Sequence, residues 1–253
     1  MKLRFLGTGT SNGVPVIGCD CEVCRSADPR DKRMRSAVLV ETDATRVLVD
    51  CGPDIRAQLL QVPFRKIDAV LLTHEHYDHT GGLDDLRPFS AFGDVDIYAN
   101  AATVKVVRHN FPYCFVEKLY PGVPKLRLHD IEKHQPLQIG DIGVMPIGIQ
   151  HDKLPILGYR FGEVAYITDM KTIDETEYGY LEGLDTLIVN ALRWEKPHHS
   201  HLIIPEAVEF ARRVGARQTF FTHLTHQIGL HERASLRLPE GMNFAYDGLT
   251  LEF

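Results

Sequence analysis

The sequence predicts a sheet-rich α/β layered fold, and three observations lead to that prediction. Short apolar runs rich in β-branched residues recur along the whole chain. Gly, Pro and Asp clusters separate these runs, as expected for turns between strands. Only three stretches carry a helical pattern, so strands outnumber helices. With 253 residues, of which 44% are hydrophobic and 25% charged, the chain can form a sizeable core.

The predicted elements follow one another closely along the chain. The predicted strands are 2–6, 37–41, 46–50, 69–73, 95–99, 125–128, 142–147, 158–161, 164–168, 186–189, 219–222, 244–246 and 249–253, and residues 42–45 are a predicted hairpin turn. The predicted helices are 53–60, 101–110 and 205–214. Pro205 and Gly215 are typical of the start and the end of the last helix. No linker or repeat divides the chain, so we expect one domain over residues 1–253.

The charge and the distribution of apolar residues argue against several kinds of partner. The formal net charge is −6, which predicts no broad basic surface for a nucleic-acid polymer or an anionic lipid. No run approaches the roughly 18 apolar residues that a membrane span needs, and the first residues lack the apolar core of a signal peptide. We therefore expect a cytoplasmic protein without a membrane partner, and a homodimer is compatible with these features.

The most informative segment follows the predicted strand 69–73. Four side chains of the kinds that bind metals lie within six residues: His74, His76, Asp78 and His79. They cannot all point the same way on one strand or one helix, so we expect a tight loop that presents them from several directions. Imidazoles and a carboxylate suit Zn²⁺, Mn²⁺ or Fe²⁺, and two such ions about 3.5–4 Å apart can hold a hydrolytic nucleophile.

This H-x-H-x-D-H pattern resembles the signature of the metallo-β-lactamase superfamily, and the resemblance extends over essentially the whole chain. It implies a four-layer αββα sandwich, in which two sheets lie between helices. It also implies a third ligand His, a bridging Asp and a final His, and these are, in order, His151, Asp169 and His223. By resemblance, the first ion binds His74, His76 and His151, the second binds Asp78, His79 and His223, and Asp169 bridges the two.

Two further carboxylates near these positions need an interpretation. Asp152 is the alternative to Asp169 as the bridging residue. Asp50 ends the predicted strand 46–50, where this superfamily tends to place a carboxylate that supports the metal loop or a ligand imidazole. Such a residue tunes a ligand without touching the metal.

Three cysteines, Cys19, Cys21 and Cys24, lie too close together for a sensible disulfide framework. Metal ligation suits them better, but a closed tetrahedral zinc site needs four ligands. His226, three residues after His223, could supply the fourth, which predicts one structural zinc beside the active centre. The alternative is three reduced cysteines in a flexible loop. This C-x-C-x-x-C loop resembles that of PhnP-type phosphoribosyl cyclic phosphodiesterases, and a pyrroloquinoline-quinone biosynthesis relative shares a similar loop.

A histidine-rich segment, His-His-Ser-His over residues 198–201, precedes the last predicted helix. It resembles a stretch of the superfamily's phosphodiesterase branch in which a histidine handles the leaving group. His201 fits that residue and His199 is the second choice, while solvent-exposed loop histidines are the alternative. Protonating a departing alkoxide contributes about 10²–10⁴ in rate. We expect Asp78 and His201 to be the catalytic residues.

These features predict a metal-dependent phosphodiesterase that acts on a small phosphodiester, by resemblance a five-membered cyclic ribose phosphate. Its cofactors would be two divalent ions, Zn²⁺ or Mn²⁺, and one structural zinc. An RNA 3′-end endonuclease is one alternative, but that family inserts a substrate-binding arm between the third His and the bridging Asp, and only 18 positions separate His151 from Asp169. A non-catalytic carrier like the quinone-biosynthesis relative is the other. A lactam or thioester substrate is less favoured.

Overall fold

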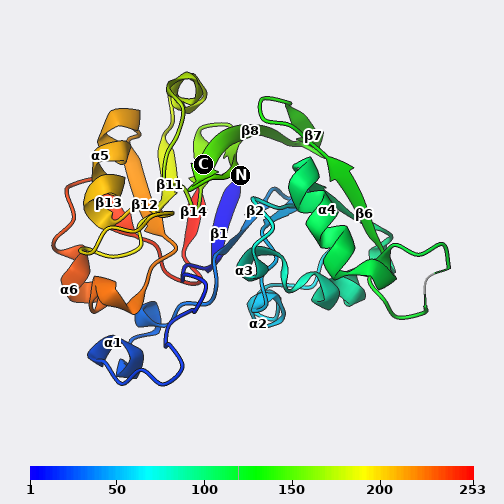
Figure 1. Cartoon of the computed structure of the whole chain (residues 1–253), viewed down its shortest axis with the longest axis horizontal. Helices are drawn as coiled ribbons and strands as arrows, with labels where there is room; N and C mark the ends of the chain where they lie inside the picture. The colour runs from blue at the N-terminus through cyan, green and yellow to red at the C-terminus, as the bar shows by residue number, and fades with distance from the viewer. Residues whose placement is uncertain (119) are drawn as a thin grey trace.

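Two mixed sheets, each of seven strands, form the centre of the protein (Figure 1). The computed structural model describes residues 1–118 and 120–253. In spatial order, the first sheet contains β14 (Thr250–Glu252), β1 (Lys2–Gly7), β2 (Ala37–Glu41), β3 (Arg46–Val49), β4 (Ala69–Leu71), β5 (Val95–Ala99) and β6 (Leu126–Asp130). The second contains β13 (Met242–Phe244), β12 (Gln218–Thr222), β11 (Thr186–Asn190), β10 (Val164–Ile167), β9 (Leu154–Phe161), β8 (Ile142–His151) and β7 (Leu137–Ile139).

Helices and short 3₁₀ segments connect these strands. The α-helices are α1 (Glu22–Arg25), α2 (Ile55–Leu59), α3 (Tyr77–Thr80), α4 (Ala101–Asn110), α5 (Ile204–Val214) and α6 (His231–Ser235). The 3₁₀ segments are η1 (Pro29–Asp31), η2 (Leu83–Phe92), η3 (Pro112–Cys114), η4 (Glu175–Leu181) and η5 (His226–Ile228). In α5, Pro205 lies in the first turn and Gly215 takes the left-handed conformation just past the end, as the sequence predicts.

Three apolar layers hold the sheets and helices together, because alternate residues of a strand face opposite sides of its sheet. In β2, Val38 and Val40 pack between the two sheets against Tyr159 and Tyr166 of the second sheet. Leu39 points the other way and packs with residues of α2, η2 and α4. On the outer face of the second sheet, α5, α6 and η4 cover a third apolar cluster. The arrangement confirms the four-layer αββα sandwich.

The parallel strands of both sheets end along one edge of the molecule. Strands β3, β4, β5 and β6 are parallel neighbours, and so are β10, β11, β12 and β13. Asp50 directly follows β3, Asp169 follows β10 by two residues, and His223 directly follows β12. Carboxyl ends of parallel strands meet at the same edge, so segments far apart in the sequence deliver their side chains to one place.

The elements predicted from the sequence agree with the structure to within two residues at most of their bounds, and two differences affect the site. Strand β8 runs on to His151, four residues beyond the predicted end, and pairs with β9 in a hairpin. The segment after β4 is not only a loop, since Tyr77–Thr80 forms one turn of helix, α3. Strand β7 and the short helices α1, α3 and α6 were not predicted, because three to five residues carry too little periodicity.

Candidate metal centre and active site

Three residues at the strand ends adopt a backbone conformation that most side chains avoid. Asp50, Asp169 and His223 have φ values of 64°, 57° and 56°, in the left-handed region. Outside glycine, such conformations cluster at functional sites because the surrounding structure must hold them. In this conformation the backbone turns directly after each strand, and the side chain points into the space between the edges of the two sheets.

The first group of histidines has its ring nitrogens oriented by hydrogen bonds. His151 Nδ1 donates to the carbonyl oxygen of Ser200 at 2.8 Å, so its Nε2 carries the lone pair. His74 Nδ1 lies 3.0 Å from Thr73 Oγ1, and His74 Nε2 lies 2.9 Å from His76 Nδ1. One ligand atom from each of His74, His76 and His151 lies within 4.8 Å of the others. These rings can hold an ion as neutral imidazoles.

The second group surrounds the carboxylate of Asp169. His79 Nε2 lies 3.2 Å from Asp169 Oδ2, and His223 Nε2 lies 3.1 Å from Asp169 Oδ1. Asp78 Oδ2 lies 3.4 Å from the same nitrogen of His79 and 3.7 Å from that of His223. Asp169 therefore turns one oxygen toward each of these two imidazoles, and it also lies within 4.8 Å of ligand atoms of His74 and His151 from the first group. Asp152, the alternative bridging residue, is exposed on the hairpin turn.

Asp50 orients one of these rings. It is fully buried and accepts from His79 Nδ1 at 2.7 Å, from Thr73 N at 2.9 Å and from Thr73 Oγ1 at 3.0 Å. When the ring is neutral, this hydrogen bond places the proton of His79 on Nδ1 and leaves the lone pair on Nε2. The structure thus gives Asp50 the supporting position that the sequence suggested for it.

The chemistry of this donor set fits divalent cations. Among the described residues, the buried atoms His79 Nε2, His223 Nε2 and His223 Nδ1 have no hydrogen-bond partner, which is costly unless something else engages them. Burial opposes a charge on His79, yet Asp169, Asp50 and Asp78 outweigh it and raise the pKa of that ring well above its ordinary value. Burial lowers the pKa of His74 well below its ordinary value. The cluster attracts positive charge and offers neutral nitrogen ligands.

The structure brings His201, and not His199, to this cluster. His201 Nδ1 lies 3.6 Å from Asp169 Oδ1, and its ring centroid is 4.6 Å from that of His151 and 4.8 Å from that of His223. Its side chain is 11% exposed, whereas His199 is exposed. Burial lowers the pKa of His201 to about 2, against the opposing effect of Asp169.

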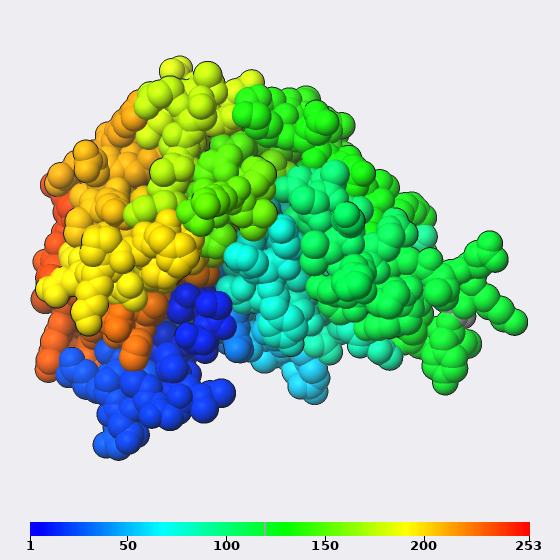
Figure 2. Space-filling model, in the orientation of Figure 1, coloured from blue at the N-terminus to red at the C-terminus, as the bar shows by residue number. Residues whose placement is uncertain are grey.

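Glycines let the metal loop approach the neighbouring backbone. A Cβ on Gly82 would collide with the backbone oxygen of Gly52, and a Cβ on Gly52 would collide with that of Asp78. The pair Gly81-Gly82 after the loop therefore has the role of permitting close approach. Figure 2 shows the surface over the site, where the blue amino-terminal, cyan metal-loop, bright green hairpin and yellow 190s segments meet.

Sequence reasoning missed Asn190, which ends β11 and is fully buried. Its Oδ1 accepts from Met170 N at 2.7 Å, and its Nδ2 donates to Met170 O at 3.0 Å. Both backbone groups of the residue after Asp169 are thereby fixed. The available signal was an amide at the end of an otherwise apolar strand, because a buried amide needs partners.

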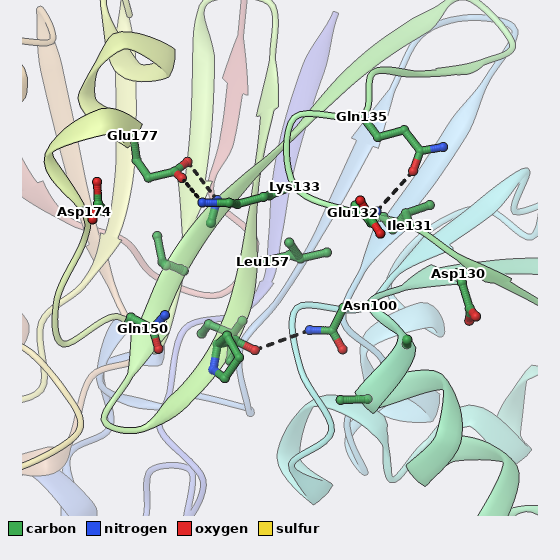
Figure 3. Close-up of a pocket in the computed structure, with 16 residues that line it drawn as sticks. Asn100, Asp130, Ile131, Glu132, Lys133, Gln135, Gln150, Leu157, Asp174 and Glu177 are labelled. Carbon is green, nitrogen blue, oxygen red and sulfur yellow. Dashed lines mark hydrogen bonds and ion pairs between the residues drawn. The ribbon is translucent and has the colours of Figure 1, made fainter.

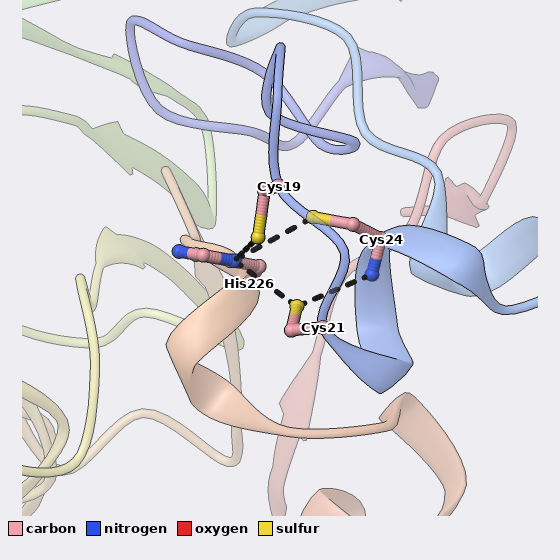
Figure 4. Close-up of side chains that lie close together, drawn as sticks. All are labelled: Cys19, Cys21, Cys24 and His226. Carbon is pink, nitrogen blue, oxygen red and sulfur yellow. Dashed lines mark hydrogen bonds between the residues drawn. The ribbon is translucent and has the colours of Figure 1, made fainter.

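Three cysteines surround one nitrogen of His226 (Figure 4). The Sγ atoms of Cys19, Cys21 and Cys24 lie 3.2, 3.2 and 3.5 Å from His226 Nδ1. In a tetrahedral zinc site, bond lengths of about 2.3 Å to sulfur and 2.0 Å to nitrogen give S···N separations of about 3.5 Å. Burial opposes ionisation of Cys21, but the Cys24 N–H and the His226 ring lower its pKa to about 6. The four residues fit a closed zinc site.

A cavity of about 680 Å³ lies between the β8–β9 hairpin and the first turn of α4 (Figure 3). Asp130, Glu132 and Asp174 contribute carboxylates to its lining, and Lys133 lies there paired with Glu177 at 2.7 Å. This acidic lining repels a phosphate group. A phosphate fits the histidine cluster better than this cavity.

The family described as beta-lactamase superfamily domain matches residues 45–224, which include the metal loop, His151, Asp169 and His223. The chain belongs to the metallo-β-lactamase superfamily. The structure of a diphosphatase from the PhnP family is 41% identical, covers 100% of this chain and 96% of its own, and superposes with a TM-score of 0.92. This fold and this neighbour support a hydrolase, and the superfamily fold implies divalent metal ions.

Two other relatives carry names that differ from that of the diphosphatase. An octanoyltransferase of Porphyromonas gingivalis is 43% identical over 250 residues, which are 98% of this chain. The chain spans about half (51%) of that relative's length, so the transferase name describes a longer protein. Zinc-bound PqqB of Methylobacterium extorquens is 21% identical over the whole of both chains with a TM-score of 0.81, and shares the fold. No helix among the described residues is long and apolar enough to span a membrane.

Proposed function

We propose that this superfamily member is a phosphodiesterase that hydrolyses a small phosphodiester, with a five-membered cyclic ribose phosphate as the favoured substrate. The observation that supports it best is the position of His201, whose Nδ1 lies 3.6 Å from Asp169 Oδ1 beside the candidate metal ligands. Hydrolysis of a phosphodiester with an alkoxide leaving group needs an acid at this place more than lactam or thioester hydrolysis does. The PhnP-family diphosphatase neighbour also supports a phosphoester substrate.

The metal centre of this proposal uses seven residues. One ion would bind His74, His76 and His151, the other would bind Asp78, His79 and His223, and Asp169 would bind both. When bound, two divalent ions, Zn²⁺ or Mn²⁺, supply Lewis acidity and offset the charge of the phosphate. A third ion, zinc, would bind Cys19, Cys21, Cys24 and His226.

The protein's own side chains orient water and move the proton. Asp78 is partly exposed at the centre, where its carboxylate can accept a hydrogen bond from the attacking water. The water oxygen forms a bond to phosphorus, and the bond from phosphorus to the ribose oxygen breaks. His201 acts as the general acid and gives a proton to the departing oxygen, and the proton that the water releases replaces it.

The structure also bears on the endonuclease alternative. The residues between His151 and Asp169 form strands β9 and β10 of the second sheet, joined by a short turn. An RNA-binding arm at this place would need residues that the sheet already uses. The negative net charge adds to the argument, since phosphate neutralisation supplies most non-specific affinity for RNA.

A substrate survey tests the proposal. Protein loaded with Mn²⁺ or Zn²⁺ should hydrolyse bis(p-nitrophenyl) phosphate and a cyclic ribose phosphate, and it should be slower on a linear dinucleotide. Preferential cleavage of RNA 3′ ends would favour the endonuclease. Absence of turnover on every diester, with both ions bound, would favour a carrier.

A further inference from the structure

The thiolate cluster and the metal centre share one short segment, His223-Leu224-Thr225-His226. Its first residue is a candidate active-site ligand, and its last is the histidine that the three cysteines surround. Leu224 between them is fully buried, donates to Thr8 O at 2.9 Å and accepts from Thr10 N at 3.2 Å. An ion in the thiolate cluster would thus fix both ends of a four-residue segment.

A series of backbone hydrogen bonds continues from this segment to the rest of the centre. Thr225 donates to Leu192 O twice, from its N at 3.1 Å and from its Oγ1 at 2.9 Å. Leu192 N donates to Leu202 O at 2.9 Å, and Leu202 N donates to Met170 O at 3.1 Å. Leu202 follows His201, and Met170 follows Asp169. The bonds that reach Leu202 and Met170 therefore lead to the neighbours of two active-site residues.

These bonds add to the others that hold the segment carrying His201, such as those from His151 Nδ1 to Ser200 O and from Ala191 N to Thr222 O. Residues 191–203 lie between β11 and α5 in no strand or helix, and several of them, including Glu195 and Lys196, are exposed. Leu192, Leu202 and Met170 are buried, so their hydrogen bonds are shielded from water, where such bonds are stronger. The position of the His201 segment therefore depends in part on Leu192, whose carbonyl oxygen accepts from Thr225.

We propose that the cluster of Cys19, Cys21, Cys24 and His226 positions the active centre, so that the centre binds its own ions more tightly when the cluster holds zinc. The coupling runs through His223 directly, and through Thr225, Leu192, Leu202 and Met170 to His201 and Asp169. The inference rests on the proposed metal ligands and not on the proposed substrate. Coupling between linked sites is reciprocal, so ions in the centre also tighten zinc in the cluster.

Binding of Mn²⁺, followed by electron paramagnetic resonance, tests the coupling without any substrate. Mn²⁺ prefers oxygen and imidazole ligands to thiolates and therefore reports on the active centre. Cys21→Ser, which removes one thiolate, should lose the cluster zinc and bind Mn²⁺ at least about fivefold more weakly, the lower end of typical couplings. Cys114→Ser is the control, because it also replaces a free thiol, but Cys114 lies in η3, far along the chain from these bonds. It should bind Mn²⁺ like the unaltered protein.

A second variant, Thr225→Val, tests the coupling if Cys21→Ser does not fold. Thr225→Val removes both hydrogen bonds of Oγ1, the one it donates to Leu192 O and the one it accepts from Gln227 N at the start of η5, and leaves all four cluster ligands in place. It should retain the zinc and still bind Mn²⁺ more weakly, while Thr225→Ser should restore the affinity. In the unaltered protein, Mn²⁺ should slow the transfer of zinc from the cluster to a chromogenic chelator. Wild-type Mn²⁺ affinity in zinc-depleted Cys21→Ser, or in Thr225→Val, would overturn the coupling, even if phosphodiesterase activity is established.

Discussion

Replacing Asp50 with asparagine should weaken metal binding through a change in which nitrogen of His79 carries its proton. Thr73 N donates to Asp50 Oδ1 at 2.9 Å, so an oxygen must stay at that place in the variant. The amide nitrogen then takes the place of Oδ2, 2.7 Å from His79 Nδ1. An amide nitrogen only donates, so His79 Nδ1 must accept, and the ring proton moves to Nε2.

The moved proton then occupies Nε2, the ring nitrogen of His79 that faces the metal centre. His79 Nε2 lies 3.2 Å from Asp169 Oδ2, and with a proton it can no longer bind an ion. Changes in residues that support a ligand typically cost about 10–100-fold in metal affinity, which corresponds to about 1.4–2.7 kcal/mol. The fold should survive, because the substituted side chain would keep its hydrogen bonds to Thr73 and His79 with one of them reversed.

Isothermal titration with Mn²⁺ or Zn²⁺ measures this loss, and thermal unfolding of the same samples checks the fold. Asp96→Asn is the matched control, because Asp96 also accepts a hydrogen bond from a histidine, His129 Nε2, at 2.7 Å. Asp96 lies in β5 and His129 in β6, at the other end of the first sheet from β1. It should leave metal affinity unchanged. If Asp50→Asn binds both ions as tightly as the unaltered protein, the tautomer argument is wrong.

Three further predictions follow from buried polar groups. Asp169→Ala removes the carboxylate that faces both His79 and His223, so metal analysis should show at least one active-site ion lost together with activity; full metal content with near-normal turnover would contradict its bridging role. Asn190→Ala leaves the buried N–H of Met170 without a partner, while Met170 O keeps the bond from Leu202 N, and should cost about 1–3 kcal/mol in denaturant unfolding, so a loss under about 0.5 kcal/mol would contradict this role of Asn190. Burial raises the pKa of Asp247 from 3.8 to about 6, against hydrogen bonds from Met34 N and Thr8 Oγ1. The folded protein then binds a proton that the unfolded chain has released, so Asp247 lowers stability as pH rises from about 4 to 6, by at most about 3 kcal/mol. Asp247→Asn should remove that part of the pH dependence, and an unchanged pH profile would contradict it.

The sequence predicts the parts of this molecule that depend on local pattern. Strands such as Ala37–Glu41 and helix Ala101–Asn110 are predicted to the residue, because apolar periodicity and turn residues act over short distances. The metal loop is also visible in the sequence, since its four polar side chains follow an apolar strand. Its one-turn helix is not, because four residues fixed by contacts with Gly52 and Cys51 show no period of their own.

Contacts between distant segments explain what sequence reasoning could not reach. The end of β8 at His151 is set by pairing with β9, where Ile149 lies opposite Ile156 and His151 opposite Leu154. The role of Asn190 depends on Met170, 20 residues earlier, and that of Thr225 on Leu192, 33 residues earlier. Hydrogen bonds of this kind leave no periodicity in the sequence.

The most direct measurement of the proposed mechanism compares leaving groups in His201→Ala that retains its metals. The variant should lose about 10²–10⁴ in kcat on a cyclic ribose phosphate, whose departing alkoxide needs a proton. It should lose much less on bis(p-nitrophenyl) phosphate, because p-nitrophenolate departs without protonation. Metal analysis of the same sample confirms that the centre is intact. An equal loss on both substrates would contradict the account, and would show that His201 binds or orients the phosphate instead of donating a proton.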